Sequence, residues 1–282
     1  MLEWGAMSDA PARHEEPLPE PARKGSPKAK AMSRAAARHA APFLLWIGAM
    51  LAARLMHLTP GSATEETPSL DLLSDAALYA VQTALALGAL ALLRPWTYYQ
   101  GLFRVRHVLP ALAVGAGVFA LWVLPGSEWF RGLWPTGAEL WEKFCVWPFG
   151  SARDVAAASA EAAAKYAPAA TGWPLFAAHL LGTGLAIAVA EEFFWRGYLL
   201  RAARTPDFLD VPVGSFHAVS FLAVTAVFAA EHAEWAAGFA AGLAYGWLYL
   251  RTRDVWAACI AHAATNALLG FYVLSTGHWE FW

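Results

Sequence analysis

The chain has 282 residues, of which 58% are hydrophobic and only 15% are charged, and its formal net charge is −2. Soluble domains average about 45–50% apolar and about 25% charged residues, so the composition favours a multi-span membrane protein over a soluble domain. The chain has no basic stripe interleaved with aromatic residues, which argues against nucleic acid as a partner. Cys145 and Cys259 lack metal-site spacing, and Cys259 lies in an apolar run, so we expect no disulfide.

The N-terminal segment 1–39 is rich in alanine, proline and charged residues. Such a composition cannot bury a core, and we expect 1–39 to be a disordered cytoplasmic tail. The segment is too long and too polar for the n-region of a signal peptide, so we expect the apolar run that follows to be retained as a span.

Seven apolar runs follow, at 42–58, 70–93, 108–125, 174–200, 213–231, 235–250 and 255–274. Their lengths suit helices that cross a hydrocarbon core about 30 Å thick, and they predict an all-α, polytopic transmembrane helical bundle of about seven to eight spans. Gly238, Gly242 and Gly246 recur at four-residue steps, and we interpret them as packing positions. The tryptophan-rich stretch 126–172 favours an interfacial or re-entrant segment with a surface helix over 152–167, and leaves an eighth span open.

Basic residues alternate with neutral or acidic connections along these runs. Lys and Arg are concentrated in the tail and in 94–107, 201–212 and 251–254, whereas 59–69 and 275–282 contain neither. Because basic loops stay in the cytoplasm, we expect a multi-pass protein of the cell inner membrane with a cytoplasmic N-terminus and an external C-terminus.

The fourth run carries the first of three polar clusters, Glu191-Glu192-x-x-x-Arg196. Glu192 and Arg196 are four residues apart with the acid first, which is the favourable order for a pair on one helix face. Glu191 is then left to face the bundle interior. An interhelical salt-bridge cluster is the structural alternative for these three residues.

The other two clusters are Phe228-x-x-x-His232 and His262-x-x-x-Asn266, each with one helical turn between its members. Taken singly, an interfacial histidine and a His/Asn pair that joins helices explain them. Ionisable groups at bilayer depth cost roughly 2.5–3.5 kcal/mol each, however, so one shared site explains all three clusters better than three separate structural roles. Peptide hydrolysis uses a base for water, a group that polarises the carbonyl and donors for the oxyanion.

In this order, within a multi-span protein, the three motifs resemble the CAAX protease and bacteriocin-processing (CPBP) family of intramembrane proteases, which includes the Ras and a-factor converting enzyme. The resemblance covers about residues 173–274 and extends to the glycine-rich helix from Gly238 to Thr252. It divides the chain into the tail 1–39, N-terminal spans and an external segment over 40–172, and a protease core over 173–282. The tryptophan-rich ends also resemble the CAAX prenyl protease-related subgroup found beside exosortases, which implies a functional link to an exosortase system.

The resemblance implies a CAAX-type endopeptidase that cleaves a membrane-associated protein or peptide and needs no cofactor. Carried over to this sequence, it makes Glu191 and His232 the residues that activate the attacking water. It makes His262 and Asn266 the residues that stabilise the oxyanion.

The same resemblance gives Glu192 and Arg196 a supporting role. The chain departs from the family's pattern at Glu231, directly before His232, and we expect this carboxylate to raise the pKa of the imidazole. The expected spans also leave His232 near the external face and Glu191 nearer the cytoplasmic one. Either the fifth span starts later, with 201–217 as a longer cytoplasmic segment, or helices tilt or break.

Three alternatives stay open. In a zinc-dependent intramembrane protease, Glu191, His232 and His262 would be the ligands, although the chain lacks the His-Glu-x-x-His pairing. Buried Glu and His residues also mark the ion pathways of transporters, although we find no inverted repeat. The third alternative is a scaffold without activity, built on the same fold.

Overall fold

The computed structural model describes residues 20–58, 75–99, 104–147, 149–150 and 154–282. Every regular element in these ranges is helical, which confirms the all-α expectation. The long helices are α1 (Pro27–Leu58), α2 (Asp75–Leu93), α3 (Val108–Val123), α11 (Ala218–Ala230), α12 (Trp235–Thr252) and α13 (Val255–Thr276). Both cysteines are free, as expected.

Five described helical segments are long and apolar enough to cross a membrane, namely Pro27–Ala52, Asp75–Leu93, Val105–Gly126, Trp173–Ala202 and Val255–Thr276. The apolar helix α11 is shorter than these, and α12 does not meet the same criterion. The described part of 126–172 holds only short helices, α4 (Glu128–Leu133), α5 (Pro135–Phe144), α6 (Val155–Tyr166) and α7 (Pro168–Thr171), so no eighth span is found there. Helix α6 lies where a short helix was expected.

Helix α1 begins at Pro27, inside the segment expected to be disordered, so that expectation is wrong for residues 27–39; residues 1–19 lie outside the described part. The start has a local cause. The Ser26 hydroxyl accepts a hydrogen bond from the Ala29 backbone N–H at 3.1 Å, and Pro27 occupies the first helical position. The alanine, lysine and arginine residues that follow are strong helix formers.

The segment Trp173–Ala202 is one helical rod in which α-helical and π-helical turns alternate. Its α-helical parts are α8 (Trp173–Leu181), α9 (Ala188–Glu192) and α10 (Leu200–Ala202), and its π-helical parts are Gly182–Ile187 and Phe193–Leu199. The glutamate pair therefore lies in the short α9, between two π-helical segments. Each π-helical segment rotates the side chains that follow it, and such segments are frequent at functional sites.

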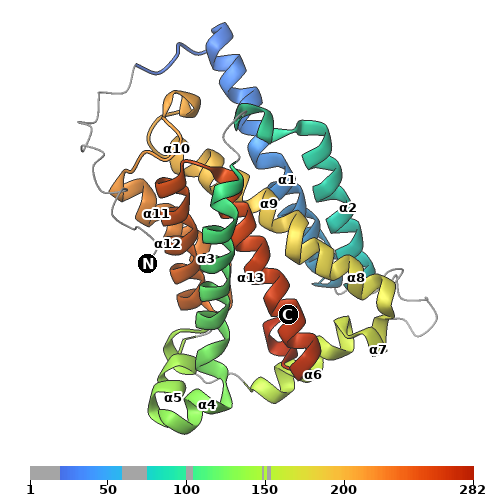
Figure 1. Ribbon diagram of the computed structural model, residues 1–282. Helices are drawn as coiled ribbons and strands as arrows, with labels where there is room; N and C mark the ends of the chain where they lie inside the picture. The colour runs from blue at the N-terminus through green and yellow to red at the C-terminus, as the bar shows by residue number, and fades with distance from the viewer. Residues whose placement is uncertain (1–19, 59–74, 100–103, 148, 151–153) are drawn as a thin grey trace, which may run out of the picture.

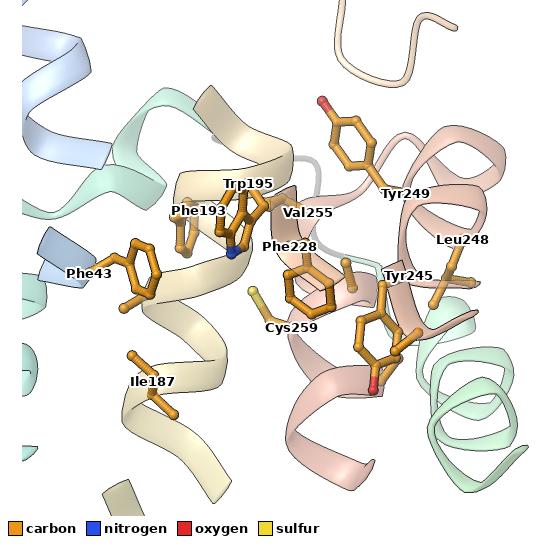
Figure 2. Packing of buried hydrophobic residues seen from close by; sticks show 14 of the residues in the cluster. Phe43, Ile187, Phe193, Trp195, Phe228, Tyr245, Leu248, Tyr249, Val255 and Cys259 are labelled. Carbon is orange, nitrogen blue, oxygen red and sulfur yellow. The ribbon is translucent and has the colours of Figure 1, made fainter. Parts of the chain in front are cut away.

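Helix α13 runs through the middle of the bundle, with α3 and α12 beside it and the α8–α10 rod behind (Figure 1). At Gly115 of α3 an added Cβ would collide with the Ala261 carbonyl of α13, so the glycine permits this close approach. Figure 2 shows the buried core at this level, where Phe43 of α1, Phe228 of α11 and Tyr245 of α12 converge on the rod and α13.

The two ends of the bundle are built from different connections. At one end Lys28 forms ion pairs with Asp207 and Asp210, and His107 bonds Asp254. Helix α11 starts only at Ala218, so the fifth run begins later than expected and 203–217 lies at this first end.

At the other end, the 231–236 turn bonds the segment after α5: the Trp147 N–H donates to the Ala233 carbonyl, and the Ala236 N–H donates to the Cys145 carbonyl. Ser159 of α6 bonds the chain at Gly277 and Trp279. The α11–α12 turn and the C-terminal residues therefore lie at the same end, opposite the basic loops.

Candidate active site

A cavity of about 280 Å³ lies toward the end that carries the 231–236 turn. All four residues expected to be catalytic line it, namely Glu191, His232, His262 and Asn266. They come from the α8–α10 rod, from the turn after α11 and from α13, so the bundle brings the three sequence clusters to one place. Trp122, Phe281 and Trp282 form part of the remaining wall.

Glu192 lies behind this wall and joins the clusters electrostatically. Its Oε1 accepts hydrogen bonds from Arg196 Nη1 at 2.7 Å and from His262 Nδ1 at 2.9 Å, and its side chain is fully buried. Arg196 also donates to the Gly242 carbonyl of α12 at 3.1 Å. The expected same-face pair of Glu192 and Arg196 is present, and it positions His262 rather than pointing into the cavity.

Glu191, unlike Glu192, is one of the residues that line the cavity. Its residue surface is only 9% exposed, and its Oε2 atom is buried without a hydrogen-bond partner. A buried carboxyl oxygen without a partner is costly unless a ligand or water completes its hydrogen bonding. Glu191 is therefore arranged to meet something that enters the cavity.

His232 lies in the turn between α11 and α12, and its tautomer is fixed by the backbone. Its Nδ1 is 2.9 Å from the Phe228 carbonyl oxygen, which can only accept, so Nδ1–H donates and Nε2 keeps its lone pair. Burial lowers the pKa of His232 to about 4. The hydrogen bond to the Phe228 carbonyl opposes this shift, but loss of hydration outweighs it, so the expected rise of the pKa is not found.

His262 and Asn266 lie one turn apart on α13. With Nδ1 of His262 bonded to Glu192, the imidazole presents Nε2 as its other polar atom. The Asn266 Nδ2 donates to the Thr183 carbonyl at 2.8 Å, which ties α13 to the first π-helical segment. The amide nitrogen carries a second hydrogen, so this bond positions Asn266 without using its full donor capacity.

Two aromatic residues hold these groups together. The Phe228 ring packs against both His232 and His262, with ring centroids 4.8 and 6.0 Å apart, and the Arg196 guanidinium lies 4.7 Å from its centroid. Sequence reasoning missed Tyr245, which lines the cavity and stacks on His262 at 5.1 Å with planes 22° apart. No local signal marks it, because an aromatic residue at helical spacing usually serves only the core.

The zinc alternative requires its three possible ligands to surround one position. Glu191, His232 and His262 line one cavity, but within the described ranges no group of three or more His, Cys, Asp or Glu residues is placed to hold a metal ion. Metal independence therefore stays a prediction.

Helices long and apolar enough to cross a membrane surround a cavity lined by a carboxyl group, two imidazoles and an amide. Residues 173–268 match the family model described as type II CAAX prenyl endopeptidase Rce1-like, and all four cavity residues lie in the matched range. This confirms the resemblance to the CPBP family, and the chain is a membrane peptidase with an Rce1-like C-terminal segment. No curated protein and no solved structure gave a significant match. The link to the exosortase-associated subgroup stays a prediction.

Proposed function

We propose that this protein is an intramembrane endopeptidase in which Glu191 and His232 activate the water that attacks the peptide carbonyl. The observation that carries the proposal is the convergence of Glu191, His232, His262 and Asn266 on one cavity. The substrate is a membrane-associated protein or peptide, in keeping with the Rce1-like match.

Water activation needs two hydrogen-bond acceptors near one oxygen. The unpartnered Oε2 of Glu191 and the lone pair on Nε2 of His232 are such acceptors. As the water oxygen bonds to the carbonyl carbon, one proton passes to Glu191, which later returns it to the leaving amine nitrogen. The Phe228 carbonyl holds His232 in the tautomer that this step requires.

The carbonyl oxygen becomes an oxyanion in the same step and needs donors. His262 supplies one through Nε2 when both of its ring nitrogens carry a proton, and the Glu192 carboxylate at Nδ1 is the partner that such an imidazolium needs. Asn266 supplies the second through the amide hydrogen that Thr183 does not bind. Glu192 and Arg196 support the reaction by orienting His262.

The basic loops lie at the end opposite the cavity, so we also propose a cytoplasmic N-terminus, an external C-terminus and a location in the cell inner membrane. On this orientation the cavity lies toward the external face.

The test compares purified wild-type protein with Glu191→Gln and His232→Ala in liposomes that contain a membrane-anchored test substrate. We expect each substitution to lower the cleavage rate by about 10²–10⁴, because general-base catalysis contributes about this much. Thermal unfolding in detergent serves as the control for folding. Normal turnover by either well-folded variant would show that the proposed roles are wrong.

A further inference from the structure

The proposed activity leaves Glu231 without a role. Glu231 lines the same cavity as the catalytic residues, directly before His232 in the α11–α12 turn, and it is exposed, unlike the buried Glu191. Glu234 lines the cavity as well. No lysine or arginine is among the lining residues, and Arg196 behind the wall is engaged by Glu192 and the Gly242 carbonyl. The exposed Glu231 carboxyl therefore meets no lysine or arginine among the residues of this lining.

An acidic lining alone does not make a binding site, but a second observation points to a ligand. Glu191 lines the same space, is nine-tenths buried, and has one carboxyl oxygen, Oε2, without a hydrogen-bond partner. A substrate that brings its scissile carbonyl to Glu191 and His232 also brings its neighbouring residues close to Glu231. Adjacent Cα atoms are about 3.8 Å apart and an extended chain advances about 3.3–3.6 Å per residue, so the Glu231 carboxyl is within reach of a side chain one or two residues from the scissile bond.

We propose that Glu231 determines specificity by pairing with a lysine or arginine side chain of the substrate, one or two residues from the bond that is cleaved. The inference rests on the proposed function and adds a substrate class to it: membrane-anchored chains with a basic residue beside the cleavage site. A cationic side chain compensates the acidic lining, whereas an acidic one would be repelled by it. A hydrogen bond between charged groups at such a site corresponds to about a tenfold or larger preference.

The experiment uses the full-length protein in liposomes with a single-span test protein whose short segment beside the membrane helix is randomised. Mass spectrometry of the products gives the residue frequencies around each cleavage site. The assay runs at pH 8, since partial loss of hydration beside the cavity raises the pKa of Glu231 to about 7 and the carboxyl is ionised above that value. The variants are Glu231→Gln, Glu231→Asp and Glu231→Lys. The matched control is Glu161→Gln, at an exposed residue of α6 that pairs with Lys165 and does not line the cavity.

We expect the wild type and Glu161→Gln to enrich lysine and arginine at one position beside the cleaved bond by about tenfold. Glu231→Asp should keep the preference, Glu231→Gln should lose it through a higher KM while still cleaving neutral sequences, and Glu231→Lys should favour aspartate and glutamate. Two results would overturn the inference and leave the proposed function intact. One is wild-type cleavage without this enrichment, and the other is unchanged enrichment in Glu231→Gln. Loss of all cleavage in folded Glu231→Gln would also overturn it. No cleavage by the wild type would contradict the proposed function itself.

Discussion

At the scale of single residues, the two adjacent glutamates have different tasks because the helix turns about 100° between them. Glu192 is fully buried and bonded to Arg196 and His262, whereas Glu191 lines the cavity and its buried Oε2 has no hydrogen-bond partner. Removing the Glu192 carboxyl would leave the buried Arg196 charge without its partner, which is strongly destabilising. The Oε2 atom of Glu191 has no hydrogen-bond partner, so we expect loss of this carboxyl to affect catalysis more than folding.

Asn266 offers a test of the oxyanion role. We expect Asn266→Ala to lower kcat by roughly 10²–10³ with a smaller effect on KM, because a donor to the oxyanion acts mainly in the transition state. Asn266→Asp should be worse still, since a carboxylate would face the developing negative charge. Steady-state kinetics in liposomes provides the measurement. An Asp variant as active as the wild type would indicate that the amide only ties α13 to Thr183.

A second prediction at the scale of single residues concerns whether activity needs a metal ion. We expect activity to survive prolonged treatment with a chelator, because Glu191 and His232 rather than a cation hold the proposed water. In a zinc enzyme, chelation would abolish activity and added zinc would restore it. Elemental analysis of active protein supplies the control: stoichiometric zinc that is lost together with activity in His262→Ala would contradict the prediction.

At the scale of elements, the π-helical segments and close helix packing assemble the site. The glycines Gly238, Gly242 and Gly246 were interpreted as packing positions, and this is confirmed: an added Cβ would meet His232, Thr225 and Phe221 at 3.2, 2.9 and 2.6 Å, respectively. Helix α12 therefore packs closely against α11. The same helix bonds Arg196 of the rod through the Gly242 carbonyl and stacks Tyr245 on His262 of α13.

The contact between α3 and α13 can be tested with a matched pair of substitutions. In Gly115→Ala the new methyl group would collide with the Ala261 carbonyl, a backbone atom that cannot rotate away, and would press on Ala264. We expect a loss of about 1–3 kcal/mol in unfolding free energy, as for overpacked cores, and a lower melting temperature in detergent. Gly117→Ala on the same helix meets nothing within 4 Å and should leave it nearly unchanged. Equal melting temperatures for the two variants would refute the close packing.

At the scale of the whole molecule, the cavity and the basic loops lie at opposite ends. The basic end gathers the start of α1, residues 104–107, the 203–217 segment and the α12–α13 turn, which contact one another through Lys28, His107 and Arg253. The cavity end gathers the described part of 126–172, the 231–236 turn and the C-terminal residues. The charge asymmetry predicts which end stays in the cytoplasm.

The orientation can be checked by labelling single cysteines from outside the cell, in a background with Cys145 and Cys259 replaced. Cysteines at positions 140 and 277 should react with a membrane-impermeant thiol reagent, because both lie in exposed segments of the cavity end. Cysteines at 25 and 253 should react only after the membrane is permeabilised. The reverse labelling pattern would place the cavity toward the cytoplasm and contradict the proposed orientation.

The sequence by itself determined the helical membrane class and singled out four residues that line one cavity. Hydrophobic runs identify buried helices because hydrocarbon admits few polar groups, and for the same reason Glu191, His232, His262 and Asn266 stand out within them. The start of α1 was also encoded locally, in the Ser26-Pro27 cap, but the high charge of 1–39 masked it.

Only the tertiary structure decided how those residues are used. The stacking of Tyr245 on His262 and the bond from Asn266 to the first π-helical segment depend on contacts between helices far apart in the sequence. The protonation of His232 is likewise not local, because burial by the surrounding helices lowers its pKa although an acidic residue precedes it in the chain. Side-chain spacing along one helix predicts which residues share a face, but the packing of the other helices determines what that face meets.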